Sequence, residues 1–196
     1  MEQFDEKQSL HLIEQMIENA KSSVKENGFH YLLWGWLVLT SSLIHFALLN
    51  FSTFSYPFLP WPVIMPIGGI IAMIYGSKTS GDSKVTTYFD TVQRYLWSAF
   101  VISLLLMLFI TISTKNELLI SPSIMILIGL AIFTSGGCLK FKPLIVGGLF
   151  SWFIGAISIF LPEWQLLLLG LSVLVGYLIP GYMLQRRVKN QKAEAT

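Results

Sequence analysis

The sequence predicts an all-α polytopic membrane protein, with six transmembrane helices arranged as three hairpins and a cytoplasmic amphipathic helix before them. The 196 residues are 54% hydrophobic and only 12% charged, about half the charged fraction of a soluble domain. Six apolar runs are long enough to cross a bilayer, which takes about 20 residues in a helix. Twelve of the 13 Lys and Arg residues fall on one side of such a bundle. This composition excludes an ordinary soluble enzyme, a disordered chain and a nucleic-acid binder with a basic face.

Residues 1–28 form the first predicted unit, a cytoplasmic amphipathic helix over Glu6–Asn27 that stops at Asn27-Gly28. The segment carries too many acids for a secretory signal and is expected to be retained. Its net charge of −3, from three Lys against six acidic residues, disfavours an anionic lipid surface. We therefore expect contact with protein, either the basic tail of the same chain or another chain. The predicted contact residues are Leu10, Ile13, Met16, Ile17, Ala20 and Val24.

Residues 29–184 form the second predicted unit, the bundle itself. None of its apolar runs contains Asp, Glu, Lys or Arg, and none alternates in polarity as barrel strands do, so helices are predicted. The predicted spans are about Tyr31–Asn50, Phe58–Gly76, Tyr95–Ser113, Leu118–Leu139, Pro143–Leu161 and Trp164–Leu184.

Prolines crowd the start of the second span. Pro57, Pro60, Pro62 and Pro66 would each remove a backbone donor, and a proline beyond the first turn kinks a helix. The regular part of this span is therefore expected to begin near Pro62 or Pro66.

The charges orient the bundle. With the N-terminus inside, Lys115 is the one cation left outside, and the positive-inside rule then places both termini in the cytoplasm. Residues 185–196 form the third unit, a basic cytoplasmic tail. Aromatic residues at the span ends are expected at the headgroup level. They are Tyr31, Trp34, Trp36, Tyr95 and Trp97 at the inner side, and Trp61 and Trp164 at the outer side.

Small residues recur every four positions in the later spans. Gly147, Ser151 and Gly155 share one stripe, and Ser172 and Gly176 repeat the spacing. In lipid such stripes let helix backbones approach closely. With six helices in the chain, we expect them to pack within one molecule. Gly136-Gly137, near the inner end of the fourth span, is expected to stop that helix.

Candidate chemistry is sparse. His45 is the one histidine deep in a span and is a candidate intramembrane polar site. A neutral imidazole that bonds a hydroxyl or carbonyl of a neighbouring helix is the favoured interpretation. Trp152, near the middle of the fifth span, needs a similar partner for its indole donor. With no ligand spacing and no nucleophile–base pair in view, we expect no metal site, no cofactor and no enzyme activity.

Three segments carry a family resemblance: NGFHYLLWGW at residues 27–36, MPIGGIIAMIYG at 65–76 and CLKFKPLIVGG at 138–148. The chain resembles a group of small six-span bacterial inner-membrane proteins with an N-terminal amphipathic helix and no assigned activity. The resemblance covers nearly the full chain and implies location and architecture. It implies no catalytic residue.

Two functions follow from these observations. The first is an accessory or regulatory inner-membrane protein that contacts a protein partner, or a second copy of itself, through the N-terminal helix, with the lipid bilayer as its other partner and no nucleic acid. The alternative is a small facilitator or channel for an uncharged solute, built from the three hairpins. A continuous polar path would favour the facilitator, and a dry, tightly packed bundle would favour the accessory protein.

Overall fold

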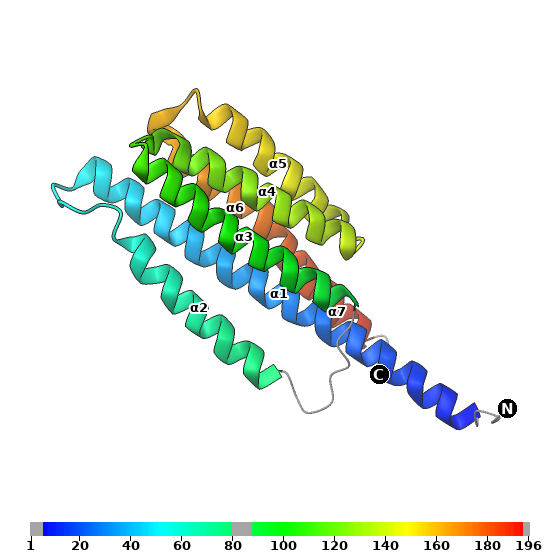
Figure 1. Ribbon diagram of the computed structural model, residues 1–196. Coiled ribbons are helices and arrows are strands. Elements are labelled where there is room, and N and C mark those ends of the chain that lie inside the picture. The colour runs from blue at the N-terminus through cyan, green and yellow to red at the C-terminus, as the bar shows by residue number, and fades with distance from the viewer. Residues whose placement is uncertain (1–5, 80–87, 194–196) are drawn as a thin grey trace.

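The protein folds as a bundle of long helices in the computed structural model (Figure 1). The backbone is described for residues 6–79 and 88–193, and the side chains for residues 28–78, 91–187 and 190. Within these ranges there are helices and turns but no strand, in agreement with the predicted fold class. The α-helices are α1 (Glu6–Phe51), α2 (Pro60–Thr79), α3 (Tyr88–Ser113), α4 (Ile120–Cys138), α5 (Lys142–Ser158), α6 (Gln165–Val173) and α7 (Ile179–Ala193).

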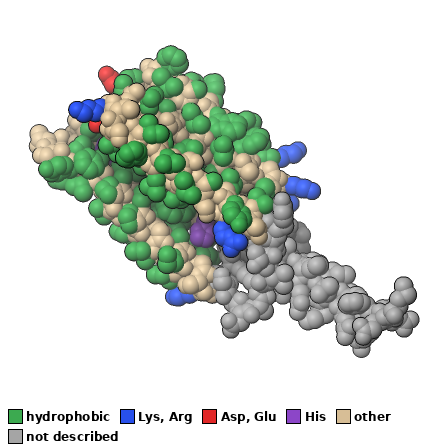
Figure 2. Space-filling model, in the orientation of Figure 1, with side chains coloured by type: hydrophobic (Ala, Val, Ile, Leu, Met, Phe, Trp, Pro, Cys, Tyr) green, Lys and Arg blue, Asp and Glu red, His purple; other side chains and the backbone are tan. Residues whose placement is uncertain are grey.

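Five of the helical passes in the described chain are long and apolar enough to cross a membrane. The pass formed by α5 is apolar but has 17 residues. Figure 2 shows hydrophobic side chains spread over the flank of the bundle, with Lys and Arg gathered at its ends. Multi-pass membrane association follows from these helices.

The helices are not equally embedded in the bundle. α4 and α5 form the most extensive pair, and α1 packs along both α6 and α7. In contrast, α2 packs chiefly on α1, and α3 chiefly on α4. Only 6% of the spanning part of α2 or of α3 is buried within the protein. The core therefore lies between α1, α4, α5 and the α6–α7 pass, and α2 and α3 are peripheral (Figure 1).

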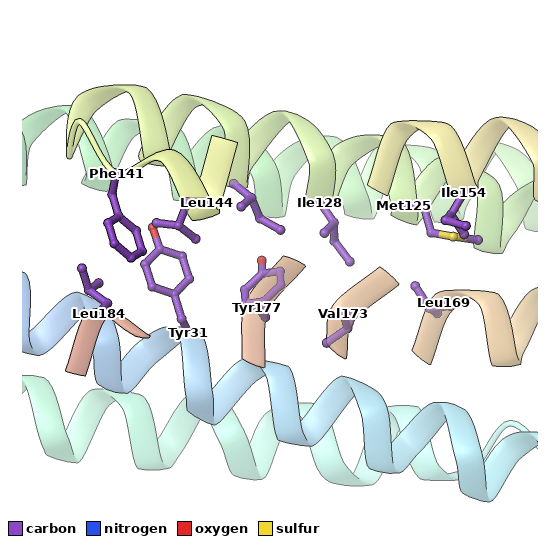
Figure 3. Close-up of a cluster of buried hydrophobic side chains, with 11 residues drawn as sticks. Tyr31, Met125, Ile128, Phe141, Leu144, Ile154, Leu169, Val173, Tyr177 and Leu184 are labelled. Atoms are coloured by element: carbon purple, nitrogen blue, oxygen red, sulfur yellow. The ribbon is translucent and has the colours of Figure 1, made fainter. Parts of the chain in front are cut away.

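The core is apolar along most of its length. Met125, Ile132, Leu144, Leu169 and Val173 are fully buried. Figure 3 labels these side chains, apart from Ile132, between α4–α5 and the α6–α7 pass, with Tyr31 toward the end that holds Phe141 and Leu184.

The small-residue stripes pack within one molecule, as predicted. A β-carbon added to Gly147 would lie 2.8 Å from the Cα atom of Gly176. One added to Gly148 would lie 2.8 Å from the carbonyl oxygen of Gly129. Helix backbones at such distances leave no room for a side chain. These glycines explain why α5 can lie so close to α4 and to the α6–α7 pass.

The predicted helix stop at Asn27-Gly28 is wrong, because α1 runs without interruption from Glu6 to Phe51. None of the described glycines has a positive φ, so Gly28 stays in the helical region. Its role is contact: a β-carbon there would lie 3.3 Å from Cγ of Gln185 in α7. The boundary at residues 28 and 29 therefore falls inside one helix. The boundary at 184 and 185 likewise falls inside α7.

Two other helix ends differ from expectation. α2 begins at Pro60 and includes Pro62 in its first turn, where a proline lacks only a donor that has no helical partner. The helix also continues through Pro66, which lies inside it and cannot donate to the carbonyl of Pro62. α4 continues through its two glycines and ends at Cys138, and the left-handed residue that caps it is Lys140, with a φ of 50°. The Lys140 amide donates to the carbonyl of Gly137 and the Phe141 amide to that of Gly136, the pattern of a Schellman cap.

The sixth pass is interrupted. A π-helical segment, Leu174–Leu178, separates α6 from α7. Pro180 lies two residues after this segment, and its ring would clash with the carbonyl of Gly176 in an ideal α-helix. Widening the preceding turn relieves that clash. Pro180 is the sequence signal for this segment, which the span prediction passed over.

Candidate functional site

The predicted contact residues lie outside the described side chains: Leu10, Ile13, Met16, Ile17, Ala20 and Val24. The backbone that carries them belongs to α1. In Figure 1 this part of α1 extends past the end of the bundle, on the side where the chain ends. The contact surface therefore stays a prediction, on a segment that is continuous with the first pass.

His45 lies half-buried in α1, close to the start of α2. Its Nδ1 accepts a hydrogen bond of 3.0 Å from Nε1 of Trp61. The partner is thus an indole, whereas a hydroxyl or carbonyl was expected. An accepting Nδ1 carries no proton, so the imidazole in this arrangement is the neutral Nε2–H tautomer. This hydrogen bond ties the peripheral helix α2 to α1.

Trp152 has the partner that the sequence called for. Its Nε1 donates to the carbonyl oxygen of Ile126 in α4, at 3.0 Å. The prediction of a facing carbonyl is confirmed. The ring also covers Gly129 of α4, so Trp152 packs and bonds across the α4–α5 pair.

Several buried hydroxyls of α1, α5 and α6 bond to helix backbone or to each other. Ser42 donates to the carbonyl of Leu166. Ser172 donates to Oγ of Ser151 at 2.9 Å, and Ser151 donates to the carbonyl of Gly147 at 3.0 Å. These bonds join helices and occupy the hydroxyls that would otherwise line a polar path.

No role for Gln165 was predicted from the sequence. This buried residue at the start of α6 donates from Nε2 to the carbonyls of Leu118 and Ser158, at 3.0 and 3.2 Å. The Leu118 carbonyl lies in the turn before α4, and the Ser158 carbonyl, which also accepts from the Leu161 amide, lies at the end of α5. A glutamine at the edge of an apolar run was the available signal.

A second cluster lies near the start of α3 and the end of α4, where Tyr31, Gln93 and Ser135 meet from α1, α3 and α4. Ser135 donates from Oγ to Oε1 of Gln93 at 3.0 Å, and the Tyr31 hydroxyl faces this pair. Tyr31 is only 2% exposed. The expected exposure of its hydroxyl at the headgroup level is therefore wrong, because its ring packs against Tyr177 and Trp97 inside the bundle. Gln93, just before the third apolar run, was also missed.

Trp36 and Tyr95, by contrast, stay on the surface, at 50% and 68% exposure. Trp36 donates from Nε1 to the hydroxyl of Tyr182 at 3.2 Å. Exposed aromatic side chains that combine an apolar ring with a polar N–H or O–H group are typical of the headgroup level.

Charges separate between the two ends of the described bundle. Lys115 lies at the end that also holds Glu117 and Glu163. The opposite end carries the other cations with described side chains, namely Lys78, Arg94, Lys140, Lys142, Arg186 and Arg187. Cys138 is exposed at this same end. Among the described residues, no three His, Cys, Asp or Glu side chains are grouped as metal ligands would be.

Comparison of the chain with protein families, curated proteins and solved structures found no match.

Proposed function

We propose that the chain is a six-span protein of the bacterial inner membrane, with both termini in the cytoplasm, that acts as a non-enzymatic accessory or regulatory protein through its N-terminal helix. The continuity of α1 carries this proposal. Residues 6–27 and the first span form one helix of 46 residues, about 69 Å long at 1.5 Å per residue. A bilayer core takes about 30 Å of that length. The remainder is available outside the membrane.

A partner held by the outer part of α1 would act directly on the first span. The same helix lies against α2, α6 and α7. A tilt or rotation imposed on its free end would therefore reach most of the bundle without a flexible joint. This is the geometry expected of a protein that passes a contact from the cytoplasm to its membrane domain, or from its membrane domain to a partner.

Six spans are supported by the length of α5. Its 17 residues extend about 26 Å, at the short end of what a bilayer accepts. Ile159 and Phe160 follow directly and are exposed and apolar, which adds to the hydrophobic length. Six passes put both termini on the side that holds most of the described cations, as the positive-inside rule requires.

The packed interior favours the accessory function over a facilitator. Met125, Ile132, Leu144 and Val173 are fully buried along the bundle axis. The buried serines of α5 and α6 bond to helix carbonyls or to each other. A facilitator for an uncharged solute would need those hydroxyls free and facing a continuous path.

The test is site-specific photocrosslinking from the N-terminal helix in native membranes. Crosslinkers placed beside the stripe should capture a partner chain. Changing Leu10, Ile13 and Ile17 to Asp should abolish the crosslinks and leave the spans inserted, because each apolar side chain loses about 1.5–3 kcal/mol of burial.

A matched control keeps the added charge and moves it to the opposite side of the helical wheel: Gln8, Gln15 and Ser22 to Asp. This variant should retain the crosslinks. Crosslinks that persist in the first variant would reject the stripe as the contact surface. Crosslinks found only to residues 186–192 of the same chain would make the helix an internal brace and reject the regulatory function.

A further inference from the structure

The cluster of Tyr31, Gln93 and Ser135 leaves two buried polar groups without a partner. These side chains are 2%, 6% and 0% exposed. The Ser135 hydroxyl satisfies Oε1 of Gln93, but Nε2 of Gln93 and the hydroxyl of Tyr31 have no hydrogen bond of normal geometry. Folded proteins satisfy nearly all such groups, with protein or with ordered water.

The rest of the described interior shows how unusual this cluster is. Gln165, equally buried, uses its Nε2 for two carbonyls. Ser41 also has an unpartnered hydroxyl, but a serine within a helix can rotate its hydroxyl onto the carbonyl one turn earlier. The Tyr31 hydroxyl lies close to Ser135 and Gln93, but neither it nor Nε2 of Gln93 makes a hydrogen bond of normal geometry there.

The chemistry of the two groups defines what they can bind. Nε2 of Gln93 can only donate, so the ligand must accept a hydrogen bond. The neighbouring side chains include Trp97, Phe141 and Tyr177, which are neutral and packed against the core. Tyr31 points from α1 into this packing (Figure 3). A charged ligand would be costly here, and tight packing favours the smallest acceptor.

We propose that Tyr31, Gln93 and Ser135 form a buried binding site for a single water molecule. The water accepts from Nε2 of Gln93 and bonds the hydroxyl of Tyr31, and it thereby joins α1, α3 and α4. The consequence falls mainly on α3. Gln93 and Thr111 are the buried polar residues of that helix among those described, and Thr111 bonds carbonyls of α3 itself. Gln93 and its water thus hold the inner half of α3 to the bundle.

The test compares thermal unfolding of the purified full-length protein with that of three variants. Tyr31→Phe removes only the hydroxyl, Gln93→Met removes the amide at similar volume, and Gln165→Met is the matched control for a fully bonded buried glutamine. A bound water predicts that all three lower Tm, with Tyr31→Phe lower by about 2–4 °C. The Tyr31→Phe and Gln93→Met effects should be less than additive in the double variant, because both act on one water.

Two results would overturn the proposal. If the site is dry, Tyr31→Phe and Gln93→Met remove unsatisfied groups, so Tm rises or stays unchanged while Gln165→Met still lowers it. If the two groups bond each other directly, the variants lower Tm, but a high-resolution structure shows Tyr31 Oη and Gln93 Nε2 or Oε1 within hydrogen-bond distance. The proposal requires a single spherical density peak within reach of both groups, and its absence, or an elongated peak, rejects it.

Discussion

Trp61 donates a hydrogen bond from its indole nitrogen to Nδ1 of His45, at 3.0 Å, and so ties the start of α2 to α1. This bond matters because α2 has few other neighbours in the described bundle. It also gives the intramembrane histidine a structural task that needs no change of charge.

The first prediction tests that task at His45. His45→Gln and His45→Asn should preserve folding, since an amide oxygen can accept the indole proton. His45→Leu should lower the free energy of unfolding by about 1–3 kcal/mol, because it leaves the half-buried indole donor of Trp61 unpaired. Thermal unfolding followed by tryptophan fluorescence measures both effects.

Trp61→Phe provides the control for this bond. Added to His45→Leu, it removes the orphaned donor and should recover part of the loss. A structural role would be rejected if His45→Gln and His45→Asn both abolished a cellular phenotype while expression and Tm stayed normal.

A second prediction concerns the glycines. Gly147→Ala should destabilise the protein by at least 1 kcal/mol, because its β-carbon would meet Gly176 at 2.8 Å. Gly69→Ala should stabilise it by about 0.5–1 kcal/mol, since nothing lies within 4 Å of that β-carbon and glycine is a poor helix residue. Tm values of the two variants should move in opposite directions. A comparable loss at Gly69 would instead reveal a contact on that face of α2.

The third prediction concerns the two left-handed lysines. Lys115 and Lys140 have φ angles of 53° and 50°, and each follows a helix that ends in the same hydrogen-bond pattern. Glycine adopts this conformation without the cost of a β-carbon. Lys115→Gly and Lys140→Gly should therefore each stabilise the fold by about 1 kcal/mol in thermal unfolding. Lys→Ala at either site keeps the β-carbon, and a gain as large as that of glycine would contradict the argument.

The fourth prediction tests topology in a Cys138→Ser background, since Cys138 is exposed and would itself react. Cysteines placed at Ser55 or Asn116 should react with an impermeant reagent added outside intact cells, and one placed at Ser83 should not. A cytoplasmic reporter fused after Thr196 should be active. Labelling of the Ser83 position from outside would overturn the proposed orientation.

The sequence alone determined that this is an all-helical membrane protein and where its passes lie to within a few residues. Long apolar runs without charge or alternating polarity can only be helices in lipid. The distribution of Lys and Arg between the loops can likewise be counted without knowing which helices contact each other. The spacing of Gly147, Ser151 and Gly155 likewise predicted close packing, because small residues are useful in membranes where backbones meet.

Only the tertiary structure decided which side chains contact each other. Gly28 reads locally as a helix stop, yet α1 continues through it, and its missing side chain makes room for Gln185 of α7. Tyr31 reads as an interfacial anchor, yet its neighbours bury it beside Gln93. His45 accepts a hydrogen bond from Trp61 because the chain turns between α1 and α2. Helical periodicity does not predict this contact. Local pattern fixes whether a residue can be helical and apolar, but which side chain it meets depends on how distant helices pack together.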